Sequence, residues 1–268
     1  MSDDVTRGYA TVDGLTMYHE IHGAGRPLLL LHGGFMTVDA LGPLLPALAT
    51  SRQVIAVELE GHGRTADLDR PLSAEQMAED VAGLLGQLGV ARADVVGYSL
   101  GGMVGLRLAS KHPELVRRLV AISAVYSNDG YYPAIVAGWR GMSAAALAGT
   151  PMERAYAETA PNPAHWPVFV EKVQHALMDF PGWPAADIAA IEAPTLLVIG
   201  DSDLVRPEHA VEMLRLLGGA PEDGGMGAPP RSQLAVLPGT THFNILYRTD
   251  LLLPIVGPFL DAPLPGVE

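Results

Sequence analysis

Short apolar runs spread along the chain constrain its fold more than any other feature. They lack the alternation of apolar and polar residues that marks a strand with one exposed face, as is typical of strands buried on both faces of a parallel sheet. The runs lie at residues 28–31, 54–57, 94–96, 119–122, 195–199 and 234–237. The sequence therefore predicts a central sheet that is covered on both sides.

Helical stretches separate most of these runs. In one of them, Ser73 can cap a helix, with Gln76 three residues later and an apolar face beyond it. Near the amino terminus, two strand-like runs flank Asp13-Gly14, which predicts an antiparallel hairpin. Alternating strands and helices favour the α/β class, with a mostly parallel central sheet flanked by helices.

A G-x-S-x-G turn at residues 97–101 follows one apolar run and precedes a helical stretch. Ser99 at its centre is expected in strained backbone geometry, so Gly97 and Gly101 must lack side chains for neighbouring segments to approach. The hydroxyl then stands exposed above the sheet, and the helix that begins at Leu100 points its first N–H groups toward it. This arrangement is typical of a serine nucleophile.

A serine nucleophile needs a base and a carboxylate that orients the base, and both follow later in the chain. The loop after the run at 195–199 carries Asp201 and Asp203, either of which can be the orienting acid. His242 comes after residues 238–241, which we expect to end the last strand. Loops at the carboxyl ends of strands hold ligands in open α/β sheets, so these side chains are expected to converge.

Five ordered motifs resemble those of α/β-hydrolases of the capped, lipase- and esterase-like kind. The motifs are H-G-G-F at 32–35, E-L-E-G-H-G-R-T at 58–65, G-Y-S-L-G at 97–101, G-D-S-D at 200–203 and G-T-T-H at 239–242. The resemblance spans nearly the whole chain and implies an α/β-hydrolase fold with a helical cap. Glu58 and Thr65 depart from the family pattern, in which Asp and Ser are more common, and neither carries chemistry.

The resemblance implies a role for each matching side chain. Ser99 corresponds to the nucleophile, His242 to the general base and Asp203 to the acid. Asp203 is preferred because the family's G-x-x-D loop has its carboxylate three residues after the glycine. Asp201 is then expected to be structural.

The resemblance also implies an oxyanion hole made of two backbone N–H groups. One belongs to Leu100, and the other to the turn after His32-Gly33, with Gly34 the better candidate and Phe35 the second. Both donors belong to the main chain, so no side chain in the sequence can identify them.

A long insertion separates the run that ends near residue 122 from the run that begins at residue 195. Residues 126–187 contain all three tryptophans and six other aromatic residues, which predicts a helical cap inserted in a single α/β-hydrolase domain of residues 1–268. These aromatics can form a pocket wall that selects substrates by shape, or the core of a small subdomain. The candidate pocket residues are Phe35, Tyr132, Trp139, Trp166 and Trp183.

Other polar motifs have simpler structural interpretations. His32 and the His62/Arg64 turn are expected to hold their loops by hydrogen bonds. His19 and His22 do not form a metal site in this interpretation, because residues three apart on a strand point to opposite faces. Neither a phosphate-binding loop nor a dinucleotide-binding motif occurs, so no cofactor or metal is expected.

Composition limits the class of partner. A formal net charge of −13 disfavours nucleic acid and anionic membrane surfaces. The chain has no cysteine, its first seven residues are polar, and no run is long enough to span a bilayer, so a cytoplasmic location is expected. Residues 218–230, rich in glycine and proline, predict a mobile surface loop.

These features favour an enzyme that hydrolyses carboxylic esters, including lactones, of small to medium uncharged substrates through an acyl-enzyme. Relatives of the fold that cleave carbon–carbon bonds or form peracids share the serine triad and stay open as alternatives. A hydrolase-fold receptor that binds a small molecule and turns over slowly is the alternative outside enzymes. Substrate identity and oligomeric state are left open by the sequence.

Overall fold

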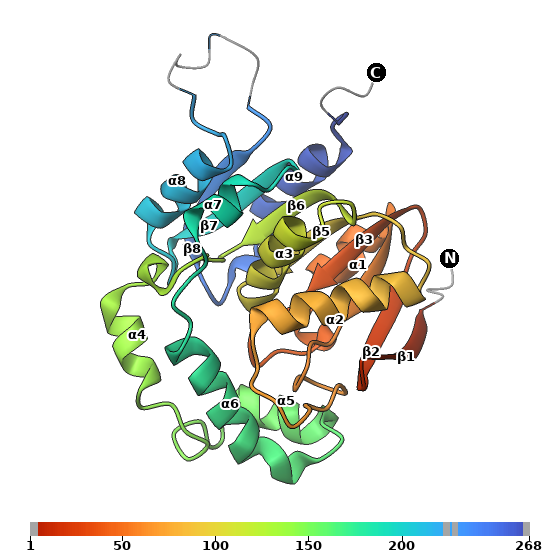
Figure 1. Cartoon of the computed structure of the whole chain (residues 1–268), viewed down its shortest axis with the longest axis vertical. Coiled ribbons are helices and arrows are strands. Elements are labelled where there is room, and N and C mark those ends of the chain that lie inside the picture. Colours follow the sequence, from red (N-terminus) through yellow and green to blue (C-terminus); the bar gives the residue numbers. More distant parts are fainter. Residues whose placement is uncertain (1–4, 222–225, 227–229, 265–268) are drawn as a thin grey trace.

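The structure is a computed structural model that describes residues 5–221, 226 and 230–264. Among these residues, eight strands form one sheet in the order β1-β2-β4-β3-β5-β6-β7-β8 (Figure 1). The strands are β1 (Thr6–Val12), β2 (Leu15–His22), β3 (Arg26–Leu31), β4 (Arg52–Val57), β5 (Ala93–Tyr98), β6 (Val116–Ile122), β7 (Thr195–Ser202) and β8 (Gln233–Thr241). β2 pairs antiparallel with β1 and with β4, and every other neighbouring pair is parallel.

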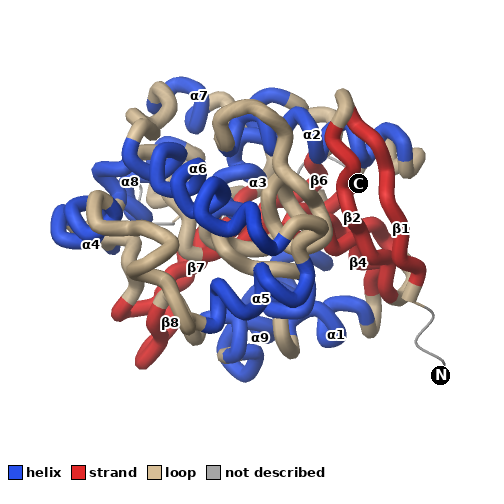
Figure 2. Tube along the Cα trace, turned by 90° about the horizontal axis from the view of Figure 1, so that it is seen from below, coloured by secondary structure: helices blue, strands red, loops and turns tan. Residues whose placement is uncertain are grey.

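Helices connect the strands and cover the sheet (Figures 1 and 2). The α-helices are α1 (Leu44–Ala49), α2 (Ala74–Gln87), α3 (Leu100–Lys111), α4 (Pro133–Trp139), α5 (Pro151–Thr159), α6 (Trp166–Met178), α7 (Ala185–Ala189), α8 (Pro207–Leu216) and α9 (Thr249–Asp261). Short 3₁₀ turns are η1 (Val38–Leu41), η2 (Asn128–Gly130), η3 (Pro163–His165) and η4 (Ile245–Tyr247). Within the described part of the chain, no helix combines the length and the apolar character needed to cross a membrane.

The core lies on both faces of the sheet because successive residues of a strand point to opposite sides. In β3, Leu29 and Leu31 pack in the cluster that includes α2 and α3, whereas Leu28 and Leu30 pack in the cluster that includes α1 and α9. All four side chains are almost fully buried. This burial on two sides explains why the apolar runs lack alternation.

The expected α/β class, the opening hairpin and the mostly parallel sheet are confirmed. Ser73 also caps α2 as expected, because its side chain accepts a hydrogen bond from the Gln76 N–H. The expected end of the last strand at 238–241 is wrong, since β8 runs to Thr241. β8 is an edge strand, where proline costs little, and Thr241 still pairs with Ser202.

Residues 126–187 contain α4, α5 and α6, which Figures 1 and 2 show together at one end of the sheet. β6 precedes this segment and β7 follows it. The loop predicted at 218–230 lies partly outside the described residues, which exclude 222–225 and 227–229.

Candidate active site

The turn between β5 and α3 holds Ser99 in the left-handed region, at φ 52°. A Cβ atom on Gly97 would overlap the backbone of Gly101, and one on Gly101 would overlap the carbonyl of Leu31. Side chains at these two positions would therefore push α3 away from β3 and β5. The Ser99 N–H is fixed by donation to the Ile122 carbonyl at 2.8 Å.

A chain of hydrogen bonds joins three side chains from separate loops. Ser99 Oγ lies 3.1 Å from His242 Nε2, and His242 Nδ1 lies 2.7 Å from Asp203 Oδ1. An ionised carboxylate only accepts, so Nδ1 carries the proton and Nε2 is left to accept the Ser99 proton. The Tyr98 hydroxyl donates to the backbone carbonyl of His242 at 2.6 Å, which holds the loop after β8.

The two candidate acids occupy different surroundings. Asp203 is buried and accepts hydrogen bonds from the Ser123 hydroxyl at 2.5 Å and the Gly200 N–H at 3.1 Å. Burial raises the pKa of the Asp203 carboxyl, but the hydrogen bonds from His242 and these two donors outweigh it and hold the pKa below its usual range. Asp203 therefore stays ionised beside the imidazole.

Asp201 is not part of this chain of hydrogen bonds. Its carboxylate is exposed and accepts from the backbone N–H groups of Gly239 and Thr240, at 2.9 and 3.1 Å. These bonds tie the end of β7 to the end of β8, next to His242. The Asp201 side chain thus stabilises the segment that precedes His242.

The two residues whose backbone N–H groups are the expected oxyanion donors both belong to the cavity wall. Gly34 follows β3, and Leu100 is the first residue of α3; both line the same cavity as Ser99. Within the described part of the chain, neither N–H donates to a protein acceptor. Phe35 adopts φ 60°, a left-handed conformation that is costly for an aromatic residue and gives the turn its shape.

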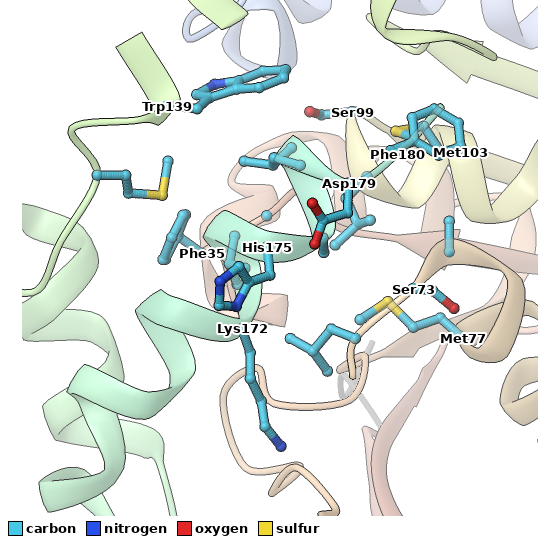
Figure 3. Close-up of a pocket in the computed structure, with 18 of the residues that line it drawn as sticks. Phe35, Ser73, Met77, Ser99, Met103, Trp139, Lys172, His175, Asp179 and Phe180 are labelled. Carbon is cyan, nitrogen blue, oxygen red and sulfur yellow. The ribbon is translucent and has the colours of Figure 1, made fainter. Parts of the chain in front are cut away.

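The cavity has a volume of about 870 Å³, within the range of small-molecule sites. Figure 3 shows Ser99 at one part of its wall, with Trp139, Phe35, Met103 and Phe180 around the same space. Further apolar lining residues are Leu72, Met77, Tyr131, Met142, Leu147, Met152, Val173, Leu177, Leu204 and Phe243. The cavity is therefore mostly apolar, with the Ser99 hydroxyl and further polar groups, among them His175 and Asp179, in its wall.

Only part of the predicted aromatic wall faces this cavity. Phe35 and Trp139 line it, but Tyr132 is 44% exposed and does not. Trp166 packs against Phe35 with ring centroids 5.8 Å apart, and Trp183 donates from Nε1 to Glu75. For Tyr132, Trp166 and Trp183 the pocket prediction is corrected: the two tryptophans are buried in the core of the inserted segment and its contact with α2.

Cationic side chains in the cavity wall are already paired. Arg70 bonds to Glu60 and Asp80, at 2.6 and 2.7 Å, and both carboxylates are almost fully buried. Lys172 of α6 bonds to Asp67 and to the Leu68 carbonyl. Neither cation is left to neutralise a negatively charged ligand.

The two histidines of the supporting turns are buried. His32 bonds to the Gly33 carbonyl at 2.7 Å and accepts from the Leu59 N–H at 3.1 Å, while His62 bonds to the Glu60 carbonyl at 2.9 Å. Burial lowers the pKa of His32 to about 3 and that of His62 to about 4. These contacts agree with the structural role expected for both side chains.

No sequence motif singles out Tyr98, Ser123 or the methionines of the cavity wall. Tyr98 occupies a variable position of G-x-S-x-G, and Ser123 follows an ordinary apolar run. No motif near Met103 or Met142 indicates whether the side chain lines the cavity or lies in the core. Only the packing of distant segments reveals these positions.

Comparison with known proteins agrees with the fold and the motifs. A family model described as alpha/beta hydrolase fold matches residues 26–249. A relative from Azorhizobium caulinodans, named carbamate hydrolase RutD, is 38% identical over 123 residues, which is 46% of each chain. This chain thus spans less than half the length of that relative.

Two further proteins match over more of their length. A relative with the same name from Pseudomonas savastanoi pv. phaseolicola is 31% identical over 227 residues, covering 74% of this chain and 86% of the relative. The solved structure of E-2-(acetamidomethylene)succinate hydrolase is 23% identical, with a TM-score of 0.76 over 96% of this chain and 100% of that one. The protein therefore belongs to the alpha/beta hydrolase fold family.

Proposed function

We propose that the protein hydrolyses carboxylic esters, lactones included, of uncharged small to medium substrates through an acyl-enzyme. The observation that carries the proposal is the hydrogen-bond chain from Ser99 through His242 to Asp203, which opens into an apolar cavity. In this proposal Ser99 is the nucleophile, His242 the general base and Asp203 the group that orients it. Residues 126–187 act as a cap that supplies part of the pocket wall.

Acylation follows from the tautomer of His242. Nε2 takes the Ser99 proton while Oγ attacks the ester carbonyl, and the Gly34 and Leu100 N–H groups donate to the oxyanion that forms. Collapse of this intermediate breaks the bond to the alcohol, which leaves with the proton held on Nε2. Asp203 stabilises the imidazolium throughout, because its carboxylate accepts from Nδ1.

Deacylation reverses the roles with water. His242 removes a proton from a water molecule, whose oxygen attacks the acyl carbon, and the same two N–H groups hold the second oxyanion. The Ser99 oxygen then leaves and regains its proton from Nε2. The products are a carboxylic acid and the free enzyme.

The pairing of charges in the cavity wall favours binding of uncharged substrates. Arg70 and Lys172 already neutralise buried or partly buried carboxylates, so a carboxylate on the substrate would lose water without gaining an ionic partner. The overall charge of −13 adds repulsion at a distance. A neutral apolar acyl or alcohol group can pack against the apolar part of the lining without this cost.

Carbamate cleavage is a second candidate, favoured by the names of the two relatives. The same steps apply to a carbamate, in which a nitrogen is attached to the carbonyl that Ser99 attacks. The nitrogen lowers the electrophilicity of the carbonyl, so the two classes are separated by rate rather than by site. Matched substrates that differ only in this atom decide between them.

A substrate panel tests the proposal. Neutral p-nitrophenyl esters of graded chain length, their carboxylate-bearing analogues, matched N-alkyl carbamates and β-diketones are each assayed for multiple turnover. Neutral esters are expected to give the highest kcat/KM and carboxylate-bearing esters the lowest. Preference for carbamates or β-diketones would replace the ester assignment, and binding of ligand without turnover would favour the receptor alternative.

A further inference from the structure

Ser123 lies at the carboxyl end of β6, one strand away from the loop that carries Asp203. Its side chain is fully buried, and its hydroxyl donates to Asp203 Oδ2 at 2.5 Å. The opposite oxygen, Oδ1, accepts from His242 at 2.7 Å. Ser123 therefore holds the side of the carboxylate that faces away from the imidazole.

The backbone at this position carries a cost. Ser123 has φ 53°, a left-handed conformation that serine rarely adopts and that glycine adopts freely. Its N–H donates to the Val198 carbonyl at 2.8 Å, so the main chain alone fixes the turn. A glycine would satisfy this backbone better, yet it would leave Asp203 without its side-chain donor.

We infer that Ser123 is a positioning residue of the active site, whose hydroxyl fixes the carboxylate of Asp203 so that its other oxygen meets His242 Nδ1. The inference rests on the proposed roles of Ser99, His242 and Asp203. Ser123 does not reach the substrate, since it is not part of the cavity wall. It acts through the orientation and ionisation of Asp203.

Removing the hydroxyl has two physical consequences. Asp203 gains freedom to turn away from His242, because one of its charged oxygens keeps only the donor from Gly200. The pKa of Asp203 also rises toward its usual value, since the Ser123 hydrogen bond is one of the causes that lower it. A carboxylate that turns away orients His242 less well and stabilises the imidazolium less, so Ser99 reacts more slowly than in the wild type.

Ser123→Gly and Ser123→Ala separate this role from a structural one. Both remove the hydroxyl, but only glycine relieves the left-handed strain, so Ser123→Gly is expected to keep or raise the Tm, whereas Ser123→Ala does not. Ser232→Ala is the matched control: Ser232 is equally buried and accepts from the Thr195 N–H, away from Asp203. It is expected to lower the Tm and leave reactivity unchanged.

Reactivity is measured as the rate at which a fluorophosphonate labels Ser99, over a range of pH, beside Tm. Both Ser123 variants are expected to label about tenfold more slowly than the wild type across the pH range, while Ser123→Gly keeps its Tm. Wild-type labelling rates across this range in a folded Ser123→Gly protein would overturn the inference. Labelling needs no knowledge of the substrate, so wild-type protein that labels but cleaves no ester would refute the ester proposal alone.

Discussion

The two sides of the cavity are built differently. The side formed by the ends of the strands carries Ser99, His242 and Asp203, which are joined by hydrogen bonds, and His242 and Asp203 are buried. The side formed by the inserted segment carries Trp139 and Met142 and meets the cavity with mostly apolar groups. Methionine adapts its shape readily, whereas a hydrogen-bonded chain has one arrangement. The first side is suited to chemistry and the second to fitting the substrate.

The largest expected effect comes from breaking the polar side. Ser99→Ala removes the nucleophile, so esterase activity should fall by about 10⁴-fold or more, and fluorophosphonate should no longer label the protein. Ser143→Ala, at an exposed serine of the inserted segment, serves as the control and should keep both. If Ser99→Ala turned over aryl esters at the wild-type rate, Ser99 would not be the nucleophile, and the strand-end side of the cavity would not carry the chemistry.

The next effect tests whether a buried aromatic of the inserted segment supports the core. Trp166 packs against Phe35, Tyr156 and Phe169, with ring centroids 5.8, 5.2 and 6.0 Å apart. Trp166→Ala should therefore lower the free energy of unfolding by about 3 to 5 kcal/mol. Denaturant unfolding followed by circular dichroism measures this loss, and a loss under about 1 kcal/mol would contradict the core assignment.

A smaller effect is expected from Trp139, the matched tryptophan that lines the cavity. Trp139→Ala should raise KM for neutral esters about tenfold and change kcat by less than about threefold, because it removes binding surface far from the reacting bonds. Its Tm should stay close to the wild-type value. A fall in kcat with KM unchanged would mean that Trp139 takes part in the chemical step, and the two sides of the cavity would then not differ in their roles.

The last effect concerns the dependence of stability on pH. His32 and His62 have pKa values lowered by burial to about 3 and about 4, so between pH 6.5 and 4 they bind protons only after unfolding. The unfolding free energy should thus fall with decreasing pH, by up to about 1.4 kcal/mol per pH unit for each histidine. Unfolding of wild type and His62→Gln across this range measures the slope, which should be smaller in the variant. Equal slopes would show that His62 takes up no proton on unfolding.

Local sequence patterns were enough to predict those features of the fold and the site that depend only on chain direction and strand order. The apolar runs predicted the strands. Because parallel strands bring their carboxyl ends together, Ser99, Asp203 and His242 were expected at the same end of the sheet. The extension of β8 past Pro238 was not predictable in this way, because proline is tolerated only if the strand lies at an edge. Edge position is a property of the whole sheet.

The inserted segment shows the limit of such patterns. Trp139, Trp166 and Trp183 share a composition signal, but one lines the cavity and two pack in the core. Which face a helix turns inward depends on its neighbours, and α4 and α6 contact each other rather than a regular sheet. Ser123 was equally hidden, because its partner Asp203 lies 80 residues away in the sequence.

Phe35 belongs to both sides of the cavity at once. It directly follows Gly34 in the turn after β3, and its ring lies between that turn and the rings of Trp166 and Phe169 on α6. A displacement of α6 by a bulky ligand therefore presses on the residue next to the Gly34 N–H. In the proposed mechanism, this peptide link couples the fit of a ligand against α6 to the position of the Gly34 N–H that stabilises the oxyanion.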